Sequence, residues 1–260
     1  MNLSNNTILI TGGGSGIGLA LAKEFLQLNN KVIICGRNKD RLQAAKQKFP
    51  SLTVIQCDVS NEDSVSALLE EIQQKHPRLN FLVNNAGMMR LWNIQKEPTS
   101  IKEHKAEILI NLFGTIQLTQ LLIPRLLKQE NSAILNVSSA LAEVPMSAAP
   151  VYSATKAALH SYSIAIRQQL RKTNISVFEL LPAAIATDMA TEMEKRIGTK
   201  NDSRKMPPEK LAALTIKGLK NDTYEIRPGI ANTLHIIHRI FPALAEKMIS
   251  NQSEKILLKL

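Results

Sequence analysis

The chain has 260 residues and a mass of 28.8 kDa, which is enough to bury a large hydrophobic core. Hydrophobic residues make up 44% of it, so the composition excludes a disordered chain. The formal net charge of +10 would suit a nucleic-acid binder, but the basic residues are scattered and match no motif of that class. We therefore predict no nucleic-acid partner and assign the charge to a solvated surface.

Strand-like apolar runs alternate with amphipathic stretches of helical period along the whole chain. The predicted strands are 7–11, 31–35, 53–57, 80–84, 133–138, 175–181 and 223–227. The predicted helices are 16–28, 39–48, 62–75, 101–128, 151–172 and 208–219. This alternation predicts an α/β fold with a doubly wound parallel sheet of about seven strands and helices on both faces.

Three features of the sequence bear on its location. The first residues, MNLSNN, do not form a charged region followed by an apolar stretch, so no signal peptide is expected. No apolar run reaches the length of a membrane span. Cys35 and Cys57 end strand-like runs and fit no metal-site spacing, which predicts buried reduced thiols and no bound metal. A reducing cytoplasm is the expected compartment.

A glycine-rich turn follows the first predicted strand. Gly12, Gly13 and Gly14 permit backbone conformations closed to other residues, and helical spacing begins at Gly16. A strand, a glycine turn and a helix N-terminus together suit a pyrophosphate. Gly12, Gly16 and Gly18 follow G-x-x-x-G-x-G rather than G-x-G-x-x-G, and taken alone the segment leaves a glycine turn without function as the alternative.

A second constellation lies near the middle of the chain. Tyr152 and Lys156 are about one helical turn apart and project from the same face, and Ser139 ends the apolar run before them. A nearby cation lowers the pKa of a phenol, and a hydroxyl beside it can hold a substrate oxygen while a proton moves. The pair carries little weight alone, because many helices contain a Tyr and a Lys at this spacing by chance.

Taken together, these residues resemble the short-chain dehydrogenase/reductase family. The matching motifs occur in the family's order and are Thr11-Gly-x-x-x-Gly-x-Gly18, Asn84-Asn85-Ala86-Gly87, Asn111, Ser139 and Tyr152-x-x-x-Lys156. The resemblance implies a Rossmann-type fold, here one dinucleotide-binding catalytic domain over 1–260 with a substrate loop over about 184–206 and a helical tail over about 230–260. It also implies hydride transfer between a nicotinamide and a carbonyl or alcohol, by a homodimer or homotetramer.

The resemblance assigns roles at the reaction centre. Tyr152 would be the general acid in carbonyl reduction, Lys156 would lower its pKa and bind the nicotinamide ribose, and Ser139 would hold the substrate oxygen. Asn111 would bind a water that links Lys156 to solvent, with a purely structural asparagine as the alternative. Ser138 competes with Ser139, but the offset from Tyr152 favours Ser139.

The end of the second strand bears on the cofactor. Arg37 stands where an NAD site usually has an acidic residue, and an arginine here is typical of NADP-dependent family members. We therefore predict NADP(H), with NAD as the less favoured cofactor and a plain surface arginine as the alternative. The predicted cofactor contacts are Thr11, Gly12, Gly14, Ser15, Gly16, Ile17, Gly18, Arg37, Asp58, Val59, Asn85, Ala86, Gly87, Tyr152, Lys156, Pro182, Ile185 and Thr187.

Two places in the predicted cofactor site leave a question open. Asp58 and Val59 would frame the adenine, and an N-cap of the following helix is the alternative role of Asp58. Ala183 follows Pro182 where the family usually has a glycine, so the backbone beside the nicotinamide carboxamide loses freedom.

The predicted substrate pocket is largely apolar and rich in methionine, which suits a medium-sized, partly hydrophobic carbonyl or alcohol. Its predicted lining is Ser139, Leu141, Val144, Met146, Met88, Trp92 and Met189, some of which are core residues in the alternative interpretation.

Apolar residues recur at helical spacing in the tail, 241–260, with lysines between them. Packing against the protein is the favoured role, ahead of subunit pairing and of contact with an anionic membrane surface.

The alternative to an enzyme is a non-catalytic NADP-binding regulatory or cell-envelope accessory protein on the same fold. The segment LPAAIATDM gives a fainter resemblance to short-chain oxidoreductases that accompany D-alanine esterification of bacterial wall polymers.

Overall fold

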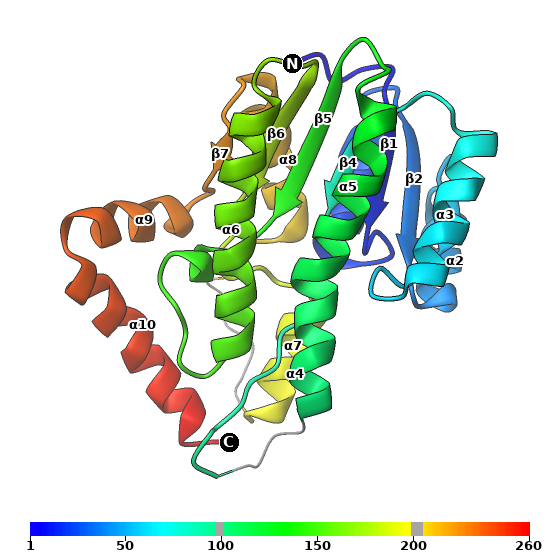
Figure 1. Cartoon of the computed structure of the whole chain (residues 1–260). Helices are drawn as coiled ribbons and strands as arrows, with labels where there is room; N and C mark the ends of the chain where they lie inside the picture. Colours follow the sequence, from blue (N-terminus) through cyan, green and yellow to red (C-terminus); the bar gives the residue numbers. More distant parts are fainter. Residues whose placement is uncertain (97–100, 199–204) are drawn as a thin grey trace.

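The computed structural model describes residues 1–96, 101–198 and 205–260, and a parallel sheet lies at its centre (Figure 1). The strands are β1 (Thr7–Thr11), β2 (Lys31–Gly36), β3 (Thr53–Gln56), β4 (Leu79–Asn84), β5 (Ser132–Val137), β6 (Ile175–Leu180) and β7 (Glu225–Ile226). In the described part of the chain they form one seven-stranded sheet in the order β3-β2-β1-β4-β5-β6-β7, with each neighbouring pair parallel. The predicted doubly wound sheet is confirmed, with β7 shorter than expected.

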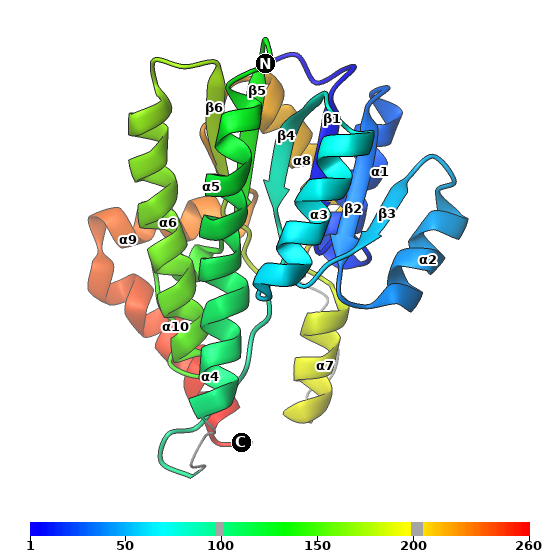
Figure 2. The same ribbon diagram turned by 45° about the vertical axis from the view of Figure 1, so that its right-hand side comes forward.

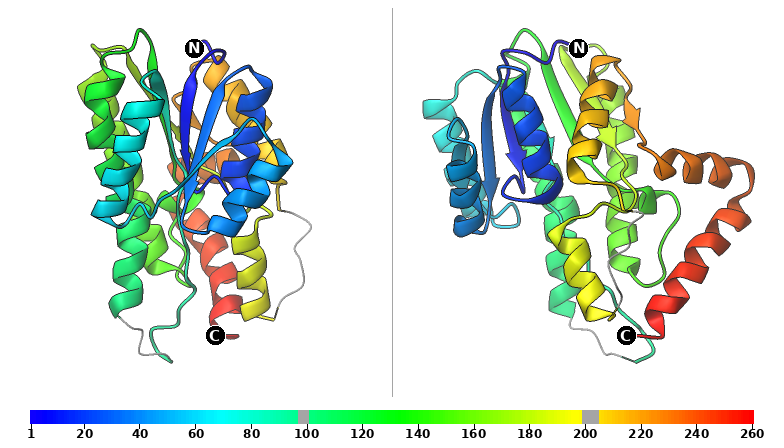
Figure 3. Two further views of the ribbon diagram at one scale, coloured as in Figure 1. Left: turned by 90° about the vertical axis from the view of Figure 1, so that its right-hand side faces the viewer. Right: turned by 180° about the vertical axis from the view of Figure 1, so that it is seen from behind.

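Helices cover both faces of this sheet (Figures 2 and 3). On one face lie α1 (Gly16–Gln27), α2 (Lys39–Lys48) and α8 (Pro208–Lys220), and on the other lie α3 (Glu62–Lys75), α5 (Gly114–Leu126) and α6 (Pro150–Leu170). Ile8 and Ile10 of β1 pack toward α1, while Leu9 between them packs toward α3 and α5. Because both faces are buried, the strands are apolar throughout rather than alternating.

A line of buried polar side chains crosses the middle of the sheet. Asn84 and Asn136 are register partners on β4 and β5, and Asn84 Nδ2 donates to Asn136 Oδ1 at 2.9 Å. Asn84 also donates to Thr119 of α5, and Asn136 donates to Ser163 of α6. The network therefore ties two strands to two helices and satisfies amides that would be costly to bury unpaired.

The helix that begins at Ile101 is interrupted. It consists of α4 (Ile101–Ile108), a π-helical turn (Leu109–Phe113) and α5, where the sequence predicted one regular helix. Among the described residues, the combined helix 101–126 is the one long and apolar enough to cross a membrane, contrary to the sequence expectation, and an 18-residue window within it has a mean hydropathy of 1.4. Because 44% of its most apolar window is buried inside the protein, length and composition are weak evidence for a span.

Several further elements lie beyond the carboxyl ends of the strands, where ligands of such sheets bind. The predicted substrate loop contains a helix, α7 (Asp188–Arg196), capped by Thr187, and residues 199–204 of that loop lie outside the described residues. The predicted tail forms two helices, α9 (Ile230–Ile240) and α10 (Pro242–Leu257), which run out from β7 and back below the sheet.

Candidate active site

The glycine turn after β1 is held in place by the loop that follows β4. The hydroxyl Oγ1 of Thr11 accepts hydrogen bonds from the backbone N–H groups of Asn85 and Ala86, both at 2.9 Å. Gly12 has φ +64°, and a Cβ there would lie 3.0 Å from Ala86 Cα. A Cβ on Gly18 would lie 2.5 Å from Gly12 O, so these positions accept only glycine.

The first turn of α1 has the properties of an anion site. Ser15 is the N-cap, but its side chain makes no capping hydrogen bond and the first turn contains no acidic residue. Within the described residues, the N–H groups of Gly16 and Ile17 therefore have no side-chain acceptor at the positive end of the helix dipole. Gly16 also approaches Thr187, since a Cβ on it would lie 3.2 Å from Thr187 Cγ2. The turn fits the pyrophosphate of a dinucleotide.

Two arginines lie near this turn. Arg37, at the end of β2, is 59% exposed, and its Nη1 lies 4.0 Å from Asp58 Oδ2. Arg41 was missed by sequence reasoning, although it follows Arg37 by four residues and lies in the first turn of α2. A Cβ on Gly14 would lie 3.4 Å from Arg41 Cβ, which places the base of that side chain against the glycine turn, and its guanidinium lies 3.5 Å from Asp188.

Asp58 does not cap the helix after it, so that alternative is wrong. The N-cap of α3 is Asn61, whose side chain accepts from Ser64 N at 2.8 Å. Asp58 Oδ1 instead accepts from both the N–H and the hydroxyl of Ser60. Val59 beside it is buried. The two residues hold the end of β3 at the predicted adenine position.

Ser139, Tyr152 and Lys156 come together beyond β5. The Ser139 hydroxyl lies near enough to the Tyr152 phenol to act on its pKa. Lys156 Nζ lies 5.5 Å from the centre of the Tyr152 ring and donates to Val137 O at 2.8 Å. The hydroxyl of Ser138 turns away into the sheet and donates to a carbonyl oxygen of β6. The geometry therefore agrees with the choice of Ser139 over Ser138.

Burial dominates the electrostatics of the pair. It raises the pKa of Tyr152 to about 12, against the opposing effect of the Ser139 hydrogen bond, and the charge of Glu107 adds to the increase. Burial also lowers the pKa of Lys156 to about 8, against the opposing charge of Glu179. The net shift of the Tyr152 pKa is therefore upward, opposite to the lowering expected from the sequence. The phenol is protonated at neutral pH, as a proton donor must be.

Asn111 lies inside the π-helical turn and is fully buried. Its Oδ1 accepts from Met88 N, and its Nδ2 donates to Met88 O, both at 2.8 Å. It also donates to Thr155 of α6, which sequence reasoning missed. Gly87 lies between Asn111 and Lys156, since a Cβ on it would be 3.4 Å from Asn111 Oδ1 and 3.6 Å from Lys156 Nζ. These bonds fix the side chain of Asn111, and its role in a water relay stays a prediction.

An apolar cluster adjoins Tyr152. It contains Met146, which was predicted for the substrate pocket, and the end of α10, which packs into it through Ile256 and Leu257. Asn93 Nδ2 donates to Leu257 O at 3.1 Å. The other members are Leu91, Ala148 and Ala149, with Met89, Met193, Ile197 and Leu260 packed against them. The tail therefore packs against the protein, as favoured by the sequence, and covers the predicted pocket.

Other predicted pocket residues are more dispersed. Leu141 and Met146 line a hollow of about 350 Å³ along α6. Trp92 packs against His104, with ring centres 4.5 Å apart. Met189 lies in the first turn of α7 and is partly buried. Val144 is fully buried against α9, so it belongs to the core and its assignment to the pocket is wrong.

The loop after β6 completes the edge of the site. Pro182 O accepts from Ala140 N at 2.9 Å, which joins the loop to the short 3-10 turn η2 (Ala140–Ala142) after Ser139. Ala183, the departure from the family pattern, packs against the cluster beneath α9. Ile185 is buried and forms an isolated bridge with Met206.

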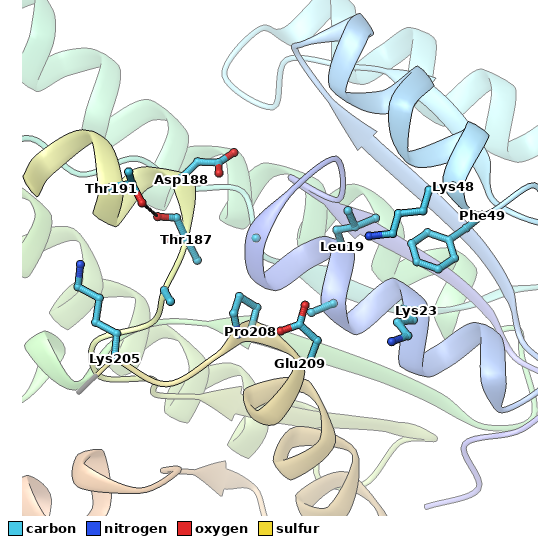
Figure 4. Close-up of a pocket in the computed structure, with 13 residues that line it drawn as sticks. Leu19, Lys23, Lys48, Phe49, Thr187, Asp188, Thr191, Lys205, Pro208 and Glu209 are labelled. Atoms are coloured by element: carbon cyan, nitrogen blue, oxygen red, sulfur yellow. Dashed lines mark hydrogen bonds between the residues drawn. The ribbon is translucent and has the colours of Figure 1, made fainter. Parts of the chain in front are cut away.

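A groove of about 410 Å³ lies next to the glycine turn, between α1, α7 and α8 (Figure 4). Gly16 and Thr187 form the wall that it shares with the predicted cofactor site, while Lys23 and Lys48 lie on its far side. Neither Ser139 nor Tyr152 lines it, so it is separate from the predicted reaction centre.

Residues 6–198 match the family model of the short chain dehydrogenases. The chain belongs to this family. The short chain dehydrogenase is 41% identical over 226 residues to the uncharacterized oxidoreductase DltE of Bacillus subtilis, covering 87% of this chain and 89% of that protein. It is 29% identical over 219 residues to the uncharacterized oxidoreductase SA2266 of Staphylococcus aureus, covering 84% of this chain and 92% of that protein. The similarity to DltE agrees with the fainter resemblance in the sequence.

Solved structures share the fold of this short chain dehydrogenase. The 3-ketoacyl-(acyl-carrier-protein) reductase of Brucella melitensis complexed with NADH superposes with a TM-score of 0.76 and 27% identity, over 85% of this chain and 93% of that one. A short chain dehydrogenase of Burkholderia cenocepacia in complex with NADP gives a TM-score of 0.82 at 22% identity, over 96% and 99%. The neighbours thus include one protein solved with NADH and one solved with NADP.

Proposed function

We propose that this short chain dehydrogenase is an NADP(H)-dependent oxidoreductase that acts on a carbonyl or alcohol of a medium-sized, partly hydrophobic small molecule. The observation that carries the proposal is the meeting of Ser139, Tyr152 and Lys156 at the sheet edge that also holds the glycine turn. The apolar cluster beside Tyr152 supports a partly hydrophobic substrate.

The preference for NADP rests on charge at the end of β2. Arg37 and Arg41 lie near the glycine turn, and no acidic residue follows β2 directly to accept hydrogen bonds from a ribose. Guanidinium groups bind phosphate in a bidentate manner, so the pair suits the 2′-phosphate that distinguishes NADP from NAD.

The residues at the centre divide the proton chemistry. Bound NADPH supplies the hydride. Tyr152, protonated because of its raised pKa, donates its proton to the carbonyl oxygen, and Ser139 holds the same oxygen by a hydrogen bond. Lys156 is mostly charged at pH 7 with a pKa of about 8, and it stabilises the phenolate that remains.

Cofactor titration tests the proposal first. We expect NADPH to bind more tightly than NADH, and Arg37→Ala to weaken NADPH by about tenfold or more while changing NADH by less than about twofold. Arg239→Ala, an exposed arginine on α9, is the matched control and should change neither affinity. Tighter binding of NADH to the wild type would overturn the assignment of Arg37.

Measurements of turnover test the catalytic part of the proposal. Wild type should oxidise NADPH with members of a ketone and aldehyde panel, and Tyr152→Phe should lower kcat by at least about 10²-fold with an unchanged NADPH Kd. NADPH binding without turnover of any panel member would favour the non-catalytic regulatory or cell-envelope accessory alternative.

We also propose a cytoplasmic homodimer or homotetramer. The buried free thiols of Cys35 and Cys57 support a reducing compartment. Exposed apolar side chains on α5 and α6, among them Leu121 and Ile164, support contact between copies. A single monomer mass by light scattering at micromolar concentration would contradict the oligomer, and sedimentation with anionic liposomes would favour membrane contact instead.

A further inference from the structure

Helix α4 carries a buried carboxyl group, that of Glu107. Glu107 is only 1% exposed and lies one turn before Asn111 on the same continuous helix. In the described part of the chain, its single hydrogen bond comes from Arg90 N at 3.3 Å. A buried carboxyl has room for several more donors, so Glu107 is under-satisfied within the protein.

The same wall contains further polar atoms without partners. Within the described residues, Arg90 Nε and both ring nitrogens of His104 are buried and make no hydrogen bond. The Arg90 guanidinium is held by Glu103 at 2.9 Å, and the His104 ring packs on Trp92. An unsatisfied buried polar group is costly, because it has lost its water without gaining a partner. Such atoms on neighbouring residues point to a polar ligand group that the site is built to receive.

This polar wall, defined by Arg90, His104 and Glu107, lies beside the reaction centre. Glu107 is close enough to Tyr152 for its charge to raise the phenol pKa. The residues on either side of Arg90, Met89 and Leu91, belong to the apolar cluster that contacts Tyr152. The polar wall and the apolar cluster therefore lie next to each other near Tyr152, the group that handles the proton.

We propose that Glu107 binds a hydroxyl group that the substrate carries close to its reacting carbonyl. The substrate class is then a hydroxyketone or hydroxyaldehyde with an apolar body, or the matching diol in the reverse direction. This inference rests on the proposed function and names its substrate class. A hydroxyl both donates, to Glu107, and accepts, from the N–H groups of Arg90 or His104.

Charged groups fit the polar wall less well than a hydroxyl. The guanidinium of Arg90 disfavours a substrate ammonium, and the carboxyls of Glu103 and Glu107 disfavour a substrate carboxylate. Burial raises the pKa of Glu107 to about 7, against the opposing effects of the Arg90 backbone bond and charge. Both protonation states of the carboxyl accept a hydrogen bond from a hydroxyl, so binding does not depend on either one.

Matched substrates test the assignment. We would compare 2-hydroxyacetophenone, 2-methoxyacetophenone and acetophenone by NADPH oxidation with wild type, Glu107→Met, Glu107→Gln and Lys105→Ala. The intrinsic reactivity of each ketone is the same for all four proteins, so it cancels when ratios of kcat/KM are compared between them. Lys105 is an exposed residue of the same helix and serves as the control for changes to α4.

The measured quantity is kcat/KM for the hydroxyketone divided by kcat/KM for acetophenone. We expect this ratio to be at least about 10-fold higher for wild type and for Lys105→Ala than for Glu107→Met. The methoxyketone should behave like acetophenone, because it cannot donate to Glu107. Glu107→Gln should recover part of the preference, because its amide keeps an oxygen acceptor.

Equal ratios in wild type and Glu107→Met would overturn the inference while leaving the proposed function standing. A uniform loss on all three ketones, with a lower melting temperature, would also overturn it by showing a structural role. Failure of the wild type to turn over any carbonyl while binding NADPH would overturn the proposed function, and the inference with it.

Discussion

Replacing Glu107 by Gln should stabilise the protein in a pH-dependent way. Burial raises the pKa of this carboxyl from 4.5 to about 7, so the folded state holds a proton that the unfolded chain releases. The stability that this proton contributes is complete below pH 4.5 and is lost as the pH rises through 7. At about 1.4 kcal/mol for each pKa unit, the wild type loses about 3 kcal/mol over this range. Gln does not titrate and avoids the loss.

Thermal unfolding monitored by circular dichroism, from pH 4 to pH 8, measures the difference. For a chain of this size, about 3 kcal/mol corresponds to roughly 6–12 °C in Tm. The Tm of Glu107→Gln minus that of the wild type should therefore grow by this amount between the two ends of the range. All other titrating groups are common to both proteins, including the facing groups Glu103, His104, Arg90 and Tyr152, so their effects largely cancel in the difference.

The exposed Glu130 provides the control, because a surface substitution to Gln should change stability by less than about 0.5 kcal/mol. A Tm difference between Glu107→Gln and the wild type that stays constant from pH 4 to pH 8 would refute the reasoning. It would mean that the carboxyl of Glu107 is solvated or fully paired, and it would remove the support for its binding role.

Three further substitutions probe other parts of the site. Gly18→Ala should abolish cofactor binding and lower stability by about 1–3 kcal/mol, because its Cβ would lie 2.5 Å from a backbone oxygen; unchanged NADPH affinity in a fluorescence titration would contradict this. Asn111→Leu should lower the free energy of unfolding, measured in urea, by about 2–4 kcal/mol, because it leaves the backbone N–H and C=O of Met88 without their hydrogen-bond partner. Ile256→Asp should raise KM severalfold with an unchanged NADPH Kd if α10 covers the substrate pocket, and steady-state kinetics with an unaffected KM would argue against that cover.

Elements whose ends are set by local chemistry were predicted closely. The helices 39–48 and 62–75 have the predicted bounds, because Asn38 and Asn61 cap them and acidic residues occupy their first turns. The π-helical turn at 109–113 was missed, because its apolar sequence has the same local pattern as a regular helix. The difference arises from where Asn111 must reach, which is a tertiary requirement.

The residues of the candidate site also fall into those that local sequence predicts and those that depend on tertiary structure. The glycine turn and the Tyr-x-x-x-Lys pair were predicted, because their function depends on a backbone conformation or on helical spacing. Glu107 and Arg41 were missed, because an acid or an arginine on an amphipathic helix usually faces solvent. Val144 was wrongly assigned to the pocket, because an apolar side chain in a sequence does not reveal whether it faces a ligand or the core.

The buried amides at the centre of the sheet have a consequence for folding. Asn84 and Asn136 meet only in the native register of β4 and β5. A slip of one residue in either strand would turn the amide of that strand to the opposite face of the sheet, away from the other amide and from its helix partner, Thr119 or Ser163. Apolar side chains would tolerate such a slip better than amides do, because a displaced apolar side chain can still pack against other apolar groups, whereas a displaced amide loses its hydrogen bonds. The network thus selects the native pairing of β4 and β5, because a misaligned pairing would leave a buried amide without its hydrogen-bond partners.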